Sequence, residues 1–165
     1  SSGGGAGLNP TANYVPYNNA NTNFQDSIAY MDGSGYFHIA GTLVADADVI
    51  AYYSDERLKK DFENISNAIE KVKSLRAVTY YQNEIGDKYF GARTDRQVGV
   101  IAQDIQKVLP EAVKQAPFDM STDENGNKIS KTGENYLTVQ YEKIVPLLVA
   151  AINELTAEVE RLKQK

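Results

Sequence analysis

The sequence predicts a small α+β domain with a long C-terminal coiled-coil helix, preceded by a β-rich segment. Three observations support this prediction. All 17 Lys and Arg residues lie after residue 53, so the composition changes abruptly there. Before that point, short apolar stretches alternate with turn residues, which is typical of β-strands. Near the C-terminus, apolar residues recur every three or four positions, which is typical of a helix that associates with other helices.

The composition of the 165-residue chain excludes several classes of function. A net charge of −5 argues against binding to nucleic acid or to an anionic membrane. The chain has no Cys and one His, which excludes disulfides, thiolate metal sites and a histidine metal cluster within one copy. We therefore expect no metal and no cofactor, and we expect a surface or packing role for His38. No apolar run reaches the roughly 18 residues that a membrane-spanning helix needs.

Residues 1–53 are rich in Gly, Asn, Tyr and Ala and carry four acidic residues. Turn residues at Asp32–Gly35 separate two predicted strands, Ile28–Met31 and Tyr36–Ile39, and a third strand is predicted at Thr42–Ala45. The apolar residues are too few to close a core within one copy. We therefore expect this segment to gain stability by association.

Residues 54–136 are predicted to form a small α+β unit. Its first helix has apolar residues at helical spacing and could be capped by Asn64 or Ser66. These apolar residues are Ile65, Ile69, Val72 and Leu75. β-Branched and aromatic residues then predict a strand over Ala77–Gln82, and a polar loop is predicted over Gly86–Arg96.

A second strand is predicted over Val98–Ala102, and it leads into an amphipathic helix that Pro110 ends. The apolar residues of that helix are Ile105, Val108 and Leu109. Residues 115–135 form a polar region in which Asn125-Gly126 indicates a β-hairpin. Helices and strands are thus mixed within one small unit.

Residues 137–165 are predicted to form the C-terminal helix. Its apolar residues alternate spacings of four and three, as the a and d positions of a coiled coil do. We call them the seam: Tyr141, Val145, Leu148, Ile152, Leu155, Val159 and Leu162. One interpretation is a single amphipathic helix packed on its own domain; the other is self-association, which the strict spacing favours. Pro146 lies near the start, where the first turn tolerates it or a kink forms.

The seam alone does not establish the number of associating copies. Ile and Val at a positions with Leu at d positions are typical of a parallel dimer. A trimer therefore needs evidence from outside this helix.

The segment Ser54–Asp61 lies where the composition changes, and it begins with a candidate nucleophile. A serine hydroxyl is a weak nucleophile until a base takes its proton. Lys59 and Lys60 are the candidate bases, and an amine can act so only when it is neutral. Arg57 is excluded as the base, because a guanidinium stays protonated. Its positive charge could, however, lower the pKa of a nearby lysine. Residues five apart do not meet on a helix or a strand, so a turn or a lysine from a neighbouring copy is required.

A plainer interpretation makes Ser54 the N-cap of a helix. Asp55 and Glu56 would then lie favourably in the first turn, and the lysines would form a solvated face. Serine followed by acidic residues is common at helix starts, so residue types and spacing alone favour this interpretation.

Three ordered stretches of the chain resemble a known family and cover most of residues 54–165. They are Ser54–Asp61, Gln97–Val113 and Leu137–Leu155, the last of which contains Tyr141-Glu142-Lys143 and Pro146-Leu147-Leu148. Together they resemble the intramolecular chaperone domain at the C-terminus of phage tail spikes, tail fibres and neck appendages. That domain is also described as a self-processing peptidase with a Ser–Lys dyad.

The resemblance implies a homotrimer in which the domain helps the preceding β-rich fibre segment to trimerise and fold. It also implies autoproteolysis of the bond between Tyr53 and Ser54. Ser54 is then the nucleophile, and Lys59 rather than Lys60 is the general base. The lysine could come from the same subunit or from a neighbouring one.

On this interpretation the chain has three parts: the end of a fibre shaft at 1–53, the globular chaperone at 54–136 and the coiled-coil helix at 137–165. Its partners are further copies and the upstream fibre segment, without nucleic acid or membrane. Assembly takes place in the host cytoplasm, after which the fibre part enters the virion and the chaperone part is released. The alternatives are a non-proteolytic structural or receptor-binding trimeric fibre tip, and a generic coiled-coil module.

Overall fold

The computed structural model describes residues 14–18, 24–32, 35–50 and 54–165. Tyr53, on one side of the predicted cut, lies outside these residues. The chain divides into two compact units: Ser1–Ser54 with Ser121–Ile129, and Asp55–Met120 with Ser130–Lys165. Helices and strands are mixed, and the chain ends in a long helix, as the sequence predicts.

The first unit contains a three-stranded antiparallel sheet in the order β1-β2-β3. The strands are β1, Tyr14–Asn18, β2, Phe24–Met31, and β3, Phe37–Ile39. The strands predicted before and after the turn are confirmed, but the described chain forms no strand over Thr42–Ala45. Leu43 and Val44 there are 71% and 75% exposed, so this stretch has no neighbour in the unit to hold it as a strand.

Asp32 closes the turn between β2 and β3. Its N–H donates to the Tyr36 carbonyl at 2.9 Å, and its carboxylate accepts from the Tyr36 N–H at 2.9 Å. The other carboxylate oxygen pairs with His38 Nε2 at 2.6 Å. The His38 ring stacks on Tyr30 with centroids 4.8 Å apart, so the expected packing role of the histidine is confirmed.

The hairpin predicted from Asn125-Gly126 is also confirmed. Its strands are β7, Met120–Thr122, and β8, Lys128–Ser130. Gly126 has φ of +83°, which glycine adopts without a steric penalty. The Asp123 carboxylate accepts from the N–H groups of Asn125 and Asn127 at 2.9 and 2.7 Å, and these bonds fix the turn.

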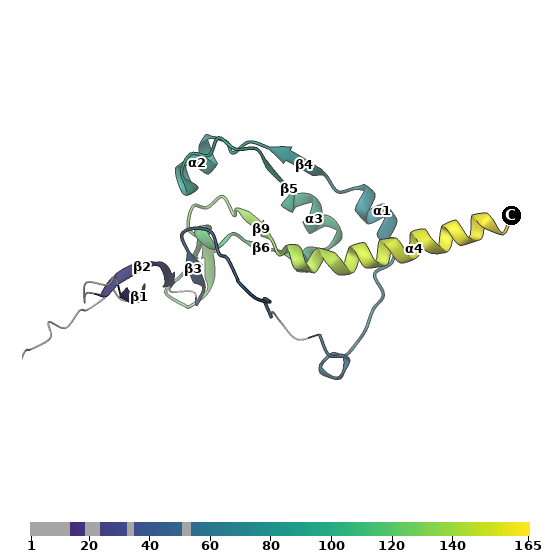
Figure 1. Ribbon diagram of the computed structural model, residues 1–165, viewed down its shortest axis with the longest axis horizontal. Helices are drawn as coiled ribbons and strands as arrows, with labels where there is room; N and C mark the ends of the chain where they lie inside the picture. The colour runs from purple at the N-terminus through teal and green to yellow at the C-terminus, as the bar shows by residue number, and fades with distance from the viewer. Residues whose placement is uncertain (1–13, 19–23, 33–34, 51–53) are drawn as a thin grey trace, which may run out of the picture. The chain divides into compact units, whose positions relative to one another are not determined.

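The second unit combines helices α1 to α4 with two antiparallel strand pairs, β4–β5 and β6–β9 (Figure 1). The elements are α1, Ala68–Lys73; β4, Ala77–Tyr80; α2, Glu84–Phe90; β5, Gln97–Val100; α3, Ala102–Val108; β6, Val113–Gln115; β9, Leu137–Val139; and α4, Val145–Lys163. The core joins α3 to the chain before α4 through Ile105, Ala112 and Ile144. Leu147 of α4 is completely buried, so the start of this helix is part of the core.

The polar loop predicted over Gly86–Arg96 is wrong in its first part, which belongs to α2. Asn83 is the N-cap, and its side chain accepts from the Gly86 N–H at 3.0 Å. Gly91, with φ of +79°, ends the helix. Asparagine at the start and glycine at the end are ordinary helix signals, but the helix has only seven residues and contains Gly86, which has a low helix propensity.

Helix α1 begins later than the spacing from Ile65 predicts. Asn67 has φ of +54°, which interrupts a helical path before Ala68. The predicted caps, Asn64 and Ser66, are therefore wrong. The N-cap position belongs to Asn67, whose side chain makes no capping hydrogen bond.

Helix α4 begins at Val145 rather than at Leu137. Leu137–Val139 forms β9, which pairs with β6 in the register Val113 to Val139. Pro146 lies in the first turn of α4, where its missing N–H removes no helical hydrogen bond. Pro110 behaves as predicted, because α3 ends at Val108 and the proline opens a 3₁₀ turn.

Asp119 is a completely buried carboxylate in the second unit. It accepts from Ser130 Oγ at 2.8 Å, from the Thr132 N–H and Oγ1 at 2.8 and 2.7 Å, and from the Tyr136 N–H at 2.9 Å. Burial acts to raise the pKa of Asp119, but the hydrogen bonds from Thr132, Ser130 and Tyr136 outweigh it and hold the pKa well below its usual range. The charge thereby ties the chain before the hairpin to the chain after it.

We expect Asp119→Asn to destabilise the fold at neutral pH, because the amide brings an NH₂ group against backbone donors. The difference from wild type should shrink in acid. A carboxyl whose pKa is lowered stabilises the fold above its unfolded pKa of about 3.9, and loses this contribution as the pH falls through the folded pKa. Urea unfolding at a series of pH values measures this. Asp123→Asn, in the hairpin turn, is the control, and an equal loss in both variants would contradict the expectation.

We expect Leu147→Ala to lower the free energy of unfolding by about 2–5 kcal/mol, because it opens a cavity in a closed core. The matched control is Leu58→Ala, at a leucine that is 62% exposed; it should change the free energy by no more than about 0.5 kcal/mol. Urea denaturation followed by circular dichroism measures both. Equal effects would mean that the start of α4 is not part of the core.

Candidate functional site

The predicted dyad residues lie in an exposed stretch, Ser54–Lys60. A single 3₁₀ turn, Glu56–Leu58, separates Ser54 from Lys59 in the chain. The Lys59 N–H closes this turn by donating to the Glu56 carbonyl at 3.0 Å. A turn between the two residues is what the sequence requires if they are to meet within one copy, and that turn is present.

Asp55, and not Ser54, is the N-cap of this turn. Its carboxylate accepts from the Arg57 N–H at 2.9 Å and from the Arg57 guanidinium at 3.1 and 2.7 Å. The side-chain hydrogen bond from Arg57 is the main cause that holds the pKa of Asp55 below its usual range. The interpretation of Ser54 as a helix N-cap is therefore wrong, because its neighbour takes that position. Arg57 is paired with Asp55, so its charge is already balanced locally.

Lys60 differs from Lys59 in its setting. Its Nζ lies 3.9 Å from Asp61 Oδ2, and its side chain is 91% exposed. Lys59 has an extended backbone and is the residue that closes the turn. The two candidate bases thus have different settings: Lys60 lies near Asp61 on the surface, and Lys59 ends the turn that follows the serine.

Helix α4 has two apolar faces. One face packs on its own domain through Leu147, which is completely buried, and through Ala151 and Glu154, which are half-buried. The adjoining face carries the six seam residues from Val145 to Leu162, and Tyr141 lies in the 3₁₀ turn just before the helix. All seven seam residues are between 42% and 62% exposed, so packing of the helix on its own domain leaves the seam partly uncovered.

Glu154 of α4 caps α1. Its Oε1 accepts from the Ala68 N–H and its Oε2 from the Ile69 N–H, both at 2.9 Å. The same two hydrogen bonds hold the pKa of Glu154 below its usual range. Because Asn67 supplies no cap, a residue 86 positions later in the chain satisfies these donors. The residues involved are far apart in the chain and no local pattern marks them, so this capping interaction could not be predicted from the sequence.

The second of the three stretches that resemble the family, Gln97–Val113, contains β5 and α3 and contacts the rest of the unit. A Cβ at Gly99 would lie 2.8 Å from the Tyr141 hydroxyl, and the Val100 N–H donates to that hydroxyl at 3.3 Å. The Asp104 carboxylate accepts from Arg76 Nε and Nη2 at 2.6 and 3.1 Å, and the Arg76 hydrogen bond lowers the pKa of Asp104. The motif is thus a structural junction.

Two features of the described residues bear on other functions. No group of three or more His, Asp or Glu side chains in them is placed to hold a metal ion. None of their helices is long and apolar enough to cross a membrane.

Comparison with known proteins identifies related sequences. Residues 54–114 match a peptidase family described as chaperone of endosialidase, and the match begins at Ser54. Long tail fiber protein Gp37 of Enterobacteria phage K3 is 39% identical over 113 residues, and that of Enterobacteria phage M1 is 34% identical over 140 residues. Myelin gene regulatory factor-like A of Dictyostelium discoideum is 30% identical over 134 residues.

The alignments cover much of this chain and little of its relatives. They span 68%, 84% and 77% of the chain, but 8%, 45% and 13% of the respective relatives. The chain therefore spans less than half of each relative's length. The resemblance predicted from the three motifs is confirmed.

We expect Glu154→Gln to loosen α1 without unfolding the unit, because the amide can accept for one of the two N–H groups and not for both. Hydrogen exchange at the Ala68 and Ile69 amides should then accelerate several-fold. Glu158→Gln is the matched control, since Glu158 pairs with Arg161 on the same helix and does not contact α1. Unchanged protection at the two amides in the Glu154 variant would contradict the capping role.

Proposed function

We propose that the chain, whose residues 54–114 match the chaperone-of-endosialidase family, is a self-cleaving trimerisation chaperone of a phage fibre. Residues 1–53 are then the end of the fibre shaft, 54–136 the globular chaperone and 137–165 the helical clamp. The long tail fibre proteins among its relatives support the fibre context. The fibre part accordingly enters the virion after assembly in the host.

The observation that carries the proposal is the position of Ser54. The family match begins at this residue, the basic residues of the chain begin just after it, and a 3₁₀ turn leads from it to Lys59. An exposed turn-forming segment suits a reaction in which the chain is its own substrate, because no binding pocket for a second molecule is needed.

In the proposed reaction, Ser54 Oγ attacks the carbonyl carbon of Tyr53, and the neutral Lys59 amine takes the hydroxyl proton. The C–N bond between Tyr53 and Ser54 breaks, the nitrogen receives a proton, and an ester joins the two residues. Water then hydrolyses the ester, so the fragments carry a new carboxylate and a new amine. The lysine must be neutral for the first step, which burial in an assembled complex favours. Lys59 of the same copy or of a neighbouring copy can serve.

The uncovered apolar surfaces support assembly as the purpose of the domain. The seam of α4 is exposed, and in the first unit Val49 and Ile50 are 75% and 97% exposed. Exposed apolar residues in both units favour association of several copies. A clamp that brings copies together raises the effective concentration of the fibre segments and sets their register. Cleavage afterwards leaves the fibre kinetically trapped.

We expect freshly expressed protein to separate into residues 1–53 and 54–165. Ser54→Ala and Lys59→Ala should each leave one full-length chain, because either change removes one half of the dyad. Lys60→Ala is the matched control: it removes a lysine from the neighbouring position and should still cleave. Intact-mass spectrometry measures the products.

Two results would refute parts of this proposal. An intact wild-type chain that nevertheless trimerises would indicate a permanent structural or receptor-binding fibre tip. Cleavage that stops in Lys60→Ala and continues in Lys59→Ala would show that Lys60, and not Lys59, is the base.

A further inference from the structure

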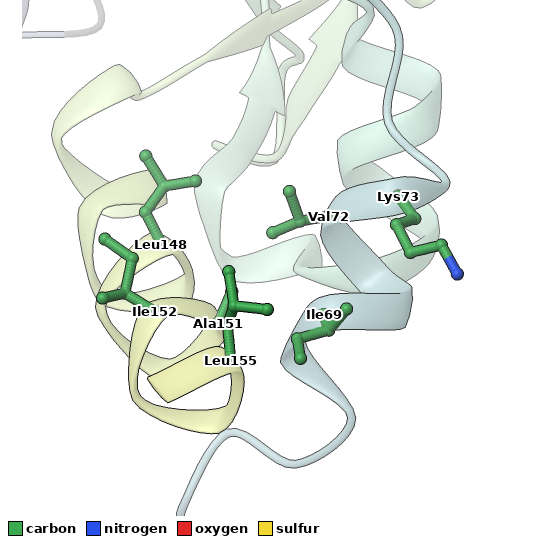
Figure 2. A pocket seen from close by; sticks show the side chains of 7 residues that line it. All are labelled: Ile69, Val72, Lys73, Leu148, Ala151, Ile152 and Leu155. Atoms are coloured by element: carbon green, nitrogen blue, oxygen red, sulfur yellow. The ribbon is translucent and has the colours of Figure 1, made fainter. Parts of the chain in front are cut away.

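The seam of α4 forms one wall of an apolar groove in its own domain. A cavity of about 310 Å³ lies between the helices, with Ile69 and Val72 of α1 on one side and Leu148, Ile152 and Leu155 of α4 on the other. Figure 2 shows α1 and α4 side by side, with Val72 pointing toward α4 and Lys73 pointing away from it. The three α4 residues are seam residues and remain at least 42% exposed, so the groove is open to solvent.

A second cavity, of about 290 Å³, continues this groove toward the start of α4. Val72 and Leu148 line both cavities, and the second adds Tyr141 and Val145 of the seam. Its opposite wall includes Leu75, which follows α1. We call the two cavities together the trough. The trough contains the first five seam residues, and its other wall is formed by α1, by the chain that follows it and by Val100 of β5.

The wall formed by α1 is held in place before any partner binds. Glu154 accepts from the Ala68 and Ile69 amides at 2.9 Å, which fastens the start of α1 to α4. Leu147, on the inner face of α4, is completely buried. A partner that enters the trough therefore meets a preformed surface of two helices.

The pattern along α4 restricts what covers the trough. Val159 and Leu162 continue the seam beyond the cavities and are 42% and 55% exposed. The occupant must therefore be apolar along one side, and must cover the seam both inside the trough and past its end. Within this chain α4 itself has that pattern, with apolar residues at a and d positions throughout. The α4 of another copy would also cover Val159 and Leu162, the seam residues that lie beyond the trough.

We propose that α4 of a second copy lies in the trough, so that the interface between copies includes α1 as well as the seam. This inference rests on the proposed assembly of the domain and adds a second helix to the contact surface. Ile69 and Val72 then pack against the seam of the neighbouring α4. A coiled coil formed by α4 alone would leave these two residues half-exposed.

Association of the full chain tests the inference. Val72→Lys should weaken self-association by about tenfold or more, because a charge then faces an apolar partner. Val98→Lys is the matched control: Val98 is 77% exposed on β5 and does not line the trough, so association should change by less than about twofold. Sedimentation equilibrium measures the association constants, and circular dichroism checks that α1 and α4 stay folded.

Cross-linking tests the same contact without disturbing the apolar surface. The chain contains no Cys, so single cysteines can be placed at will. Copies that carry Lys73→Cys and copies that carry Thr156→Cys are co-expressed and treated with a short bis-maleimide. We expect a 73–156 product between copies, and none when Asp95→Cys, in an exposed loop before β5, replaces Lys73→Cys.

The outcomes separate this inference from the proposal on which it rests. Copies that associate and cross-link through 156–156 but not through 73–156 would overturn the role of α1 and leave the assembly intact. A chain that stays monomeric at all concentrations would overturn the assembly and this inference with it. Unchanged association of a folded Val72→Lys variant would also overturn the role of α1.

Discussion

The attachment of α1 to α4 is the constraint on which the rest of the second unit depends. Two backbone N–H groups at the start of α1 have no local cap, and Glu154 accepts from both. The bonds turn one face of α4 toward its own domain, together with the buried Leu147. The adjoining face, which carries the seam, stays partly exposed beside α1 and is thereby left for contacts with other molecules. The pairing also ends the exposed segment that begins at Ser54, because Ala68 is the first residue after it that is completely buried.

The proposed self-cleavage has requirements unlike those of an ordinary active site. It would need no pocket for a foreign substrate, and it should not occur until the copies have assembled. The exposed turn after Ser54 suits the first requirement. If assembly covers this segment, burial of the amine would link the reaction to the completed complex.

Local patterns were sufficient for several elements and insufficient for others. The β2–β3 turn, the hairpin at Asn125-Gly126, the end of α3 before Pro110 and the seam all depend on residues close in the chain, and the structure contains them. The late start of α1 and the strand at Leu137–Val139 depend on partners far away in the sequence. Asn67 adopts its left-handed conformation while Glu154 supplies the cap, and β9 exists because β6 lies beside it. Propensity and periodicity carry no information about such partners.

The sequence by itself determined the resemblance to the chaperone-of-endosialidase family, the position of Ser54, the pair of candidate lysines and the apolar spacing of the last helix. These are properties of residue order, and they hold whatever the chain packs against. Only the tertiary structure decided that Glu154 caps α1, that Asp119 is buried and charged, and that α1 lines a trough with the seam. Each of these depends on groups brought together by folding: hydrogen-bond donors for a carboxylate in the first two cases, and a second apolar wall in the third.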